Sequence, residues 1–134
     1  MTDTGVQAIV AHSRIAQAEY EKNGSQQRYD HAAQAVAWVI MEPARNRRLA
    51  ELAVETTGLG NVPDKIIKNH RKTLGLMQDI QNVVTFGVMS DDPKTGITEI
   101  ARPKGVVGAI VPSTNPAATP ANNIINALKC GNSI

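Results

Sequence analysis

Residues 105–134 read GVVGAIVPSTNPAATPANNIINALKCGNSI, and this stretch decides the fold. Residues 106–111 form a short apolar, β-branched run between a glycine and a proline, which is typical of a strand buried on both faces of a parallel sheet. Ser113, Thr114 and Asn115 offer capping oxygens and Pro116 suits a first helical turn, so a helix is predicted from there to Gly131. Asn132–Ile134 would begin the next strand. Residues 104–134 are therefore expected to be a first, incomplete βα unit of a parallel sheet.

Four helices are predicted upstream, within residues 1–80. Apolar residues recur there at three- and four-residue spacing, which favours amphipathic helices. Proline and glycine set the boundaries, because proline suits a first helical turn and glycine adopts the left-handed conformation that ends a helix. The expected boundaries are Thr4 to Asn23-Gly24, Ser25 to Pro43, Pro43 to Gly58, and Pro63 to about Asp79.

The sequence pattern changes from helical to β-prone over residues 81–103, which are predicted to form a long β-hairpin. Two β-prone runs, VVTFGVM and ITEIARP, flank SDDPKTG, which is rich in turn-forming Asp, Pro and Gly. The second run alternates and is half polar, as in a ribbon that reaches over another surface. Such an arm commonly completes its burial against a partner subunit.

Composition excludes several classes of partner. Fourteen basic and twelve acidic residues leave a net charge of +2, and aromatic residues make up 3% of the chain. Neither value favours a nucleic-acid or membrane partner. One cysteine and three scattered histidines lack zinc-ligand spacing, so no metal site is expected. The sequence shows neither a secretory leader pattern nor a long apolar run, so a cytoplasmic protein is expected.

Three stretches carry a resemblance to a known family. They are TGLGNVPDKIIKNH (57–70), DDPKTGITEIARPKGVVG (91–108) and PKGVVGAIVPSTNPAATPANNIINALKCGNSI (103–134). Together they resemble the CoA-acylating branch of the aldehyde dehydrogenases, which includes acetaldehyde, succinate-semialdehyde and sulfoacetaldehyde dehydrogenases. The resemblance implies an α/β, aldehyde-dehydrogenase-like fold with three parts. Residues 1–80 would be a helical cover of the cofactor domain, 81–103 an oligomerisation arm, and 104–134 the start of an NAD-binding, Rossmann-type sheet.

The resemblance also implies a reaction. A small aldehyde would be oxidised by a nicotinamide cofactor through a thioester on an enzyme cysteine, and the acyl group would pass to coenzyme A. NAD is the expected cofactor, with NADP left open, and a homo-oligomer through the hairpin arm is the expected assembly. In this family the nucleophilic cysteine lies far downstream of this region, so residues 1–134 alone are expected to be inactive.

The sharp turn is the predicted site. Open α/β sheets bind ligands at the carboxyl ends of their strands, where the next helix offers free amides. The turn is therefore expected to border the nicotinamide half of the cofactor, through Val111, Pro112, Ser113, Thr114, Asn115 and Pro116. In the family an asparagine of this turn donates its amide to the oxyanion. Asn115 is the available asparagine, but an ungapped alignment on the two prolines places the family residue at Thr114, so the role is shared between them. The alternative is that these residues only cap a helix.

Other conspicuous residues are interpreted as structural. Cys130 lies in the last turn of a helix, where no helix amino terminus lowers a thiol pKa, so it is expected to pack. Gly105 and Gly108 precede and enter the predicted strand, whereas phosphate-binding glycines follow one. Two basic clusters are expected to be solvated helix faces: Arg45, Arg47 and Arg48, and Lys68, His70, Arg71 and Lys72. Two alternatives to an acylating enzyme remain open, a non-acylating aldehyde dehydrogenase and a helical interaction module.

Overall fold

The computed structural model describes residues 4–134, and within them it contains five helices and one two-stranded antiparallel sheet. The elements in chain order are α1 (Thr4–Lys22), α2 (Gln26–Met41), α3 (Pro43–Thr57), α4 (Val62–Ile80), β1 (Gly87–Asp92), β2 (Ile97–Ala101) and α5 (Ala118–Lys129). The four predicted helices upstream of the hairpin are confirmed.

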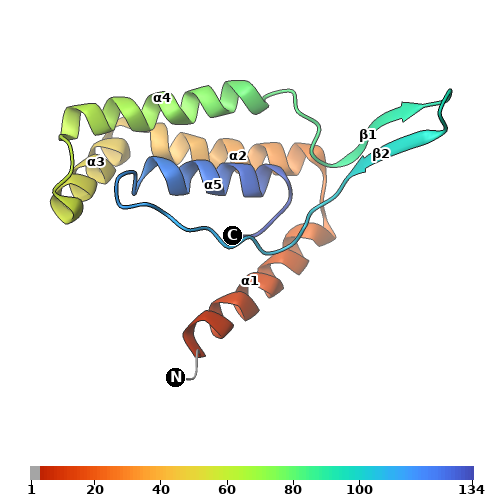
Figure 1. The fold of residues 1–134 in the computed structure, drawn as a ribbon, viewed down its shortest axis with the longest axis horizontal. Helices are drawn as coiled ribbons and strands as arrows, with labels where there is room; N and C mark the ends of the chain where they lie inside the picture. Colours follow the sequence, from red (N-terminus) through yellow and green to blue (C-terminus); the bar gives the residue numbers. More distant parts are fainter. Residues whose placement is uncertain (1–3) are drawn as a thin grey trace.

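Helices α2, α4 and α5 pack against one another and form the body of the molecule (Figure 1). Helix α3 packs at one end of this body, the hairpin projects beyond the other end, and α1 extends away from it. The core is built from small and aliphatic side chains, since Ala33, Ala37 and Ile125 are fully or almost fully buried. Alanines let the helix axes approach closely, because the distance between packed helices depends on the side chains at the contact.

The ends of α2 and α3 are stabilised by side chains that the sequence places there. The Ser25 hydroxyl accepts a hydrogen bond from the Arg28 amide at 3.1 Å, which confirms Ser25 as the cap of α2. Glu42 separates α2 from α3, and its carboxylate accepts from the amides of Ala44 (3.1 Å) and Arg45 (2.8 Å). These amides, first that of Arg45, lower the pKa of Glu42 because they stabilise its charged form.

The turn between α3 and α4 follows the predicted chemistry, with one addition. Gly58 ends α3 with a φ of +67°, in the left-handed region, and Gly60 has a φ of +75°. Helix α4 then begins at Val62, one residue before the predicted Pro63, because Asn61 caps it through a hydrogen bond from the Asp64 amide at 2.9 Å. Asn61 was not among the predicted capping residues.

The hairpin is confirmed, but it is shorter than predicted and shifted along the chain. Strand β1 begins at Gly87, because the amides of Thr85 and Phe86 donate to the Gln26 side chain instead of to a neighbouring strand. Residues 90–92 were assigned to the turn, yet they pair with β2 after a bulge between Val88 and Ser90. The hairpin base is thus attached to α2, and the turn contracts to the residues between Asp92 and Ile97.

The predicted strand 106–111 is wrong for most of its length. Its one ladder contact within residues 4–134 is a parallel bridge between Val106 and Ser133, supported by the Val107 amide donating to the Ser133 carbonyl at 2.9 Å. The expected burial on both faces is also not observed, since Ile110 is 96% exposed. A strand is held by ladder partners, and the described residues place only Ser133 beside this segment. The parallel relationship of the two segments agrees with a βα unit.

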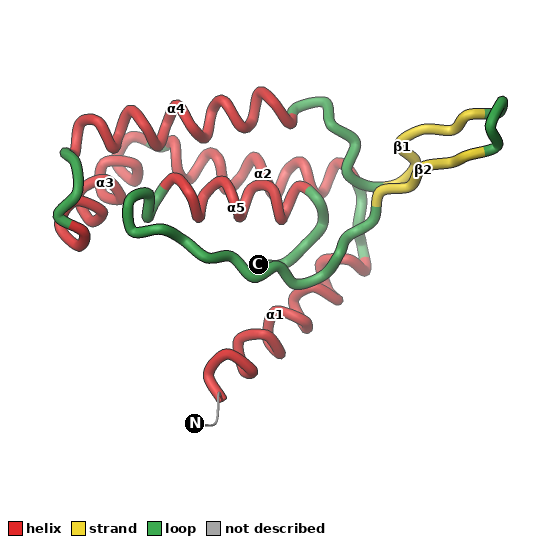
Figure 2. Tube along the Cα trace, in the orientation of Figure 1, coloured by secondary structure: helices red, strands yellow, loops and turns green. Residues whose placement is uncertain are grey.

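The predicted capping of the last helix is also wrong. Helix α5 begins at Ala118, and its N-cap residue, Ala117, makes no side-chain capping hydrogen bond. Residues 113–117 form turns and a bend instead, and Figure 2 draws the chain as loop up to the start of α5. The residue before a proline disfavours the α conformation, so Asn115, which precedes Pro116, does not belong to the helix. The hydroxyl and amide groups of this turn are consequently not used as caps.

Candidate active site

The turn of residues 111–116 joins the extended segment to the amino-terminal end of α5. Val111, Pro112, Ser113 and Thr114 are exposed, whereas Asn115 and Pro116 are partly buried. The parallel bridge to Ser133 lies at the other end of the extended segment, so this turn lies where the carboxyl end of the predicted strand would be. The structure therefore keeps all six predicted cofactor-contacting residues together on one accessible turn.

The peptide unit between Thr114 and Asn115 is held at both of its polar atoms. The Thr114 carbonyl accepts a hydrogen bond from the Lys65 ammonium at 3.2 Å. The Asn115 amide donates to the Pro112 carbonyl, also at 3.2 Å. Lys65 comes from the first turn of α4 and is 8% exposed. Sequence reasoning missed this residue, because a single lysine in an amphipathic helix carries no signal of burial.

The Asn115 side chain has an unused polar atom. Its Oδ1 is buried and has no hydrogen-bond partner within residues 4–134. Most buried polar atoms in proteins are paired, so an unpaired one calls for an explanation such as a ligand or a further partner. Thr114, in contrast, is exposed to solvent. The two oxyanion candidates are therefore adjacent but lie in different environments.

Two buried amide side chains fix the start of the extended segment and the chain after α5 that lies beside it. Asn132 Oδ1 accepts from the amides of Lys104 (2.6 Å) and Gly105 (2.9 Å). Gln17 of α1 donates to the Gly131 carbonyl at 2.9 Å and accepts from the Ser133 amide at 2.5 Å. Both residues are about 6% exposed. These polar residues were not predicted, because their partners are backbone atoms that lie far away in the sequence.

Cys130 follows α5 directly and is half-buried. Burial raises the pKa of its thiol, an effect that the neighbouring Lys129 opposes. A catalytic cysteine needs an accessible thiolate of low pKa, so this environment supports the packing role predicted for Cys130.

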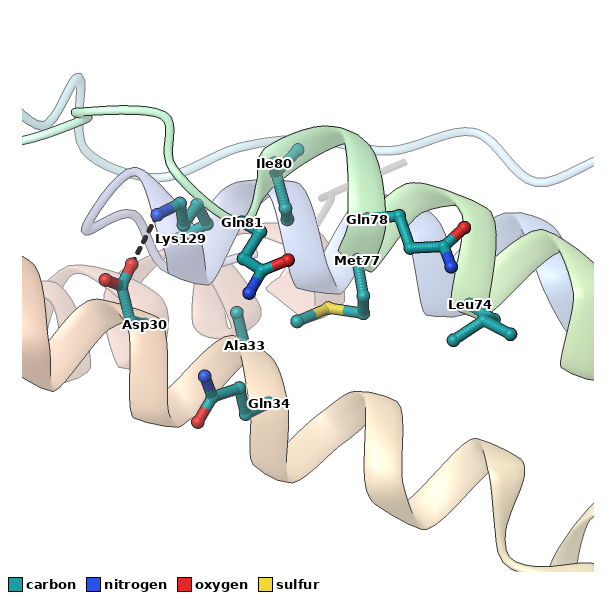
Figure 3. A pocket seen from close by; sticks show the side chains of 9 residues that line it. All are labelled: Asp30, Ala33, Gln34, Leu74, Met77, Gln78, Ile80, Gln81 and Lys129. Carbon is teal, nitrogen blue, oxygen red and sulfur yellow. Dashed lines mark hydrogen bonds and ion pairs between the residues drawn. The ribbon is translucent and has the colours of Figure 1, made fainter.

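A separate cavity of about 240 Å³ lies between α2, α4 and α5 (Figure 3). Apolar side chains line much of it, and an ion pair between Asp30 and Lys129 borders one side. None of its lining residues belongs to the turn of residues 111–116. The Asp30 carboxylate also accepts a hydrogen bond from the Gln26 side chain at 2.8 Å. Because Gln26 holds the base of the hairpin, the ion pair between Asp30 and Lys129 has a structural role.

The basic clusters lie mainly at the surface. Arg45, Arg47, Arg48, His70, Arg71 and Lys72 are exposed, as predicted, and Lys68 is partly buried. Across residues 4–134, no three His, Cys, Asp or Glu side chains gather in a way that would hold a metal ion. None of the helices in that range combines the length and the apolar character needed to cross a membrane.

The helical body, the projecting hairpin and the βα-like carboxyl-terminal region together form an α/β arrangement. Residues 1–134 match the Aldehyde dehydrogenase family, and the chain belongs to that family. It is 65% identical over 129 residues to "Sulfoacetaldehyde dehydrogenase (acylating)" of Cupriavidus necator, which covers 96% of this chain. The chain spans 26% of the length of that relative.

Solved structures give the same assignment for the fold. An acetylating aldehyde dehydrogenase from Geobacillus thermoglucosidasius superposes with a TM-score of 0.86 at 34% identity, over 98% of this chain and 30% of its own. An engineered glycolyl-CoA reductase with bound NADP+ gives 0.76 at 32% identity, over 95% of this chain and 28% of its own. The predicted α/β, aldehyde-dehydrogenase-like fold is confirmed by these similarities.

Proposed function

We propose that residues 1–134 belong to a CoA-acylating aldehyde dehydrogenase that converts a small aldehyde, a nicotinamide cofactor and coenzyme A to an acyl-CoA. The observation that carries this proposal is the 65% identity, over 96% of the chain, to an enzyme named as an acylating sulfoacetaldehyde dehydrogenase. Sulfoacetaldehyde is therefore the first substrate to test. A non-acylating enzyme is the less supported alternative, because this relative and the Geobacillus structure both carry acylating or acetylating names.

The three parts of the chain would have separate roles. Residues 1–80 would cover the cofactor domain, 81–103 would form the oligomerisation arm, and 104–134 would begin the NAD-binding sheet. The arm presents apolar side chains to solvent, with Val88 60% and Ile97 59% exposed. Exposed apolar strand residues favour burial against a second copy of the protein, so we propose a homo-oligomer that assembles through this hairpin.

The turn would contact the nicotinamide half of the cofactor through residues 111–116. Its fit rests on two observations, the exposure of Val111 to Thr114 and the unpaired Oδ1 of the partly buried Asn115. Asn115 and Thr114 would be the oxyanion donors. Asn115 is favoured, because side-chain amides stabilise an oxyanion best when they are preorganised in a site that excludes water.

The reaction needs further groups. A cysteine other than Cys130 would attack the aldehyde carbon, and the turn would stabilise the charge that develops on its oxygen. The adduct would lose a hydride to become a thioester, and a bound nicotinamide would supply the hydride acceptor. The thiol of coenzyme A would then displace the enzyme cysteine from the thioester.

The test is an assay of the whole gene product that contains residues 1–134. Sulfoacetaldehyde, coenzyme A and either NAD or NADP are supplied, reduced nicotinamide is followed by absorbance, and acyl-CoA is identified by mass spectrometry. Acyl-CoA formation that depends on coenzyme A is expected, and the rates with the two nicotinamides decide between them. Free acid as the product without coenzyme A would instead support the non-acylating alternative.

A further inference from the structure

Lys65 is a charged residue in an unusual environment. It is 8% exposed, and within residues 4–134 its ammonium forms no salt bridge with a carboxylate. The ammonium donates a hydrogen bond to the Thr114 carbonyl at 3.2 Å. Removing an ammonium from water is costly, and one neutral carbonyl does not offset that cost. The contribution of Lys65 to folding stability is therefore expected to be small or unfavourable.

The contact of Lys65 with Thr114 acts on the turn. The Thr114 carbonyl and the Asn115 amide belong to the same rigid peptide plane, so a bond at each atom restrains the rotation of that plane. The peptide plane carries the Asn115 α-carbon and thus sets the origin of its side chain. Lys65 therefore restrains the direction in which the side-chain amide of Asn115 points.

The path of the chain before α4 places Lys65 for this contact. Gly60 has a φ of +75°, and an added β-carbon there would make an ordinary van der Waals contact of 3.4 Å with Lys65 Cε. The left-handed turn before α4 therefore lies directly against the lysine stem. A cavity of about 260 Å³ at this position is lined by Leu59, Gly60, Asn61, Asp64, Lys65, Lys68 and Thr114.

We propose that Lys65 is a positioning residue of the active site, which holds the peptide unit between Thr114 and Asn115 so that the turn presents its oxyanion donor. The proposal rests on the proposed function. It assigns catalytic importance to a residue of α4 that lies forty-nine positions before its partner in the chain.

The test compares Lys65→Met with Lys68→Met in the whole gene product. Lys68 lines the same cavity and has no hydrogen bond to the turn in the described structure, so it is a matched control. Lys65→Met is expected to lower kcat about 10- to 100-fold, because small errors in placement are expensive in catalysis. The KM values should change little, and Tm should stay equal or rise because a buried charge is removed. Lys68→Met should leave kcat unchanged.

Hydrogen exchange measured by mass spectrometry gives a second readout that needs no activity. Exchange in the peptide that contains residues 112–117 should increase in Lys65→Met and stay at the wild-type rate in Lys68→Met. Equal kcat and equal exchange in the two variants would overturn the role of Lys65, as would a loss of kcat that merely follows a loss of Tm. An inactive wild type would overturn the proposed function instead, and the exchange data would then decide alone whether Lys65 restrains the turn.

Discussion

Gly131 packs directly against the ring of Tyr29. A β-carbon on Gly131 would lie 2.5 Å from Tyr29 Cε2 and 2.8 Å from Pro103 Cγ, closer than real contacts allow. The Tyr29 ring has no room to move, because it is fully buried between Tyr20 and Phe86, with ring centroids 4.9 and 5.3 Å away. This contact joins α2 to the chain that leaves α5.

Gly131→Ala is therefore expected to destabilise the fold for two reasons. The residue has a φ of +72°, and a left-handed conformation costs a non-glycine residue about 1–2 kcal/mol. Overpacking against Tyr29 adds about 1–3 kcal/mol. The matched control is Gly58→Ala, since Gly58 has a φ of +67° and no atom of the described chain within 4 Å of an added β-carbon. Urea unfolding measures both variants, and an equal loss of stability would refute the steric part.

The buried ion pair predicts an asymmetry between its two partners. The Lys129 side chain is 5% exposed and that of Asp30 is 30% exposed. Asp30→Asn leaves a buried cation without its anion, so it should cost about 3 kcal/mol. Lys129→Met removes the buried charge and leaves a carboxylate that water and Gln26 still solvate, so it should cost less. Unfolding free energies measure the difference, and the reverse order would contradict this account of the pair.

Glu42 predicts a dependence of stability on pH. Because folding lowers its pKa, the carboxylate stabilises the folded state above the pKa of the unfolded chain, and this contribution is lost as the pH falls through the folded-state pKa. Glu42→Ala should therefore lower Tm at neutral pH, and the difference from wild type should shrink in acid. Glu55→Ala is the control, since Glu55 is exposed on α3, the helix that Glu42 caps. The same Tm difference at every pH would exclude a charge effect.

Cys130→Ala tests the assignment of the only thiol in the chain. If Cys130 only packs, this variant of the whole gene product should retain wild-type aldehyde oxidation. The raised pKa also predicts slow alkylation of Cys130 by iodoacetamide at neutral pH, faster as the pH rises. Mass spectrometry of the labelled peptide measures the rate. Loss of activity at full stability would make Cys130 a candidate nucleophile.

Asn115→Ala and Thr114→Val distinguish the two oxyanion candidates. Removing one oxyanion donor typically lowers kcat about 100- to 1000-fold. This loss is expected for Asn115→Ala and not for Thr114→Val, because Asn115 carries a side-chain N–H donor at a partly buried position whereas Thr114 is exposed. Steady-state kinetics of the whole gene product gives both values. The opposite result would assign the role to Thr114, and unchanged kcat in both would remove the turn from the oxyanion site.

The helices were predictable because local chemistry specifies them. Three residues set helix boundaries through effects that reach no further than one helical turn. The Ser25 hydroxyl caps α2, the Pro43 ring suits the first turn of α3, and Gly58 ends α3 in the left-handed conformation. The errors occur where distant groups decide. The Gln26 side chain accepts hydrogen bonds from the amides of Thr85 and Phe86, which shortens β1. Gln26 and Thr85 are fifty-nine residues apart, so no local sequence pattern predicts this contact.

The sequence predicted where in the chain the candidate site lies, but not how its side chains are arranged. The apolar run before Pro112 and the helix after it located the turn, and the structure keeps its residues together. The failure of Ser113 to Asn115 to cap α5 and the contact from Lys65 depend on tertiary packing. Periodicity does not show which single lysine of α4 is buried.

The attachment of the hairpin at Gln26 has a mechanical consequence. A strand of six residues spans about 20 Å, and the ribbon is held at its base by the Gln26 side chain and by the Thr85 hydroxyl, which donates to the Lys129 carbonyl at 2.5 Å. A small change of angle at this base would displace the tip near Gly96 by a larger distance. The bonds of Gln26 and Thr85 therefore set the direction in which the ribbon projects, and with it the place where the ribbon would meet another molecule.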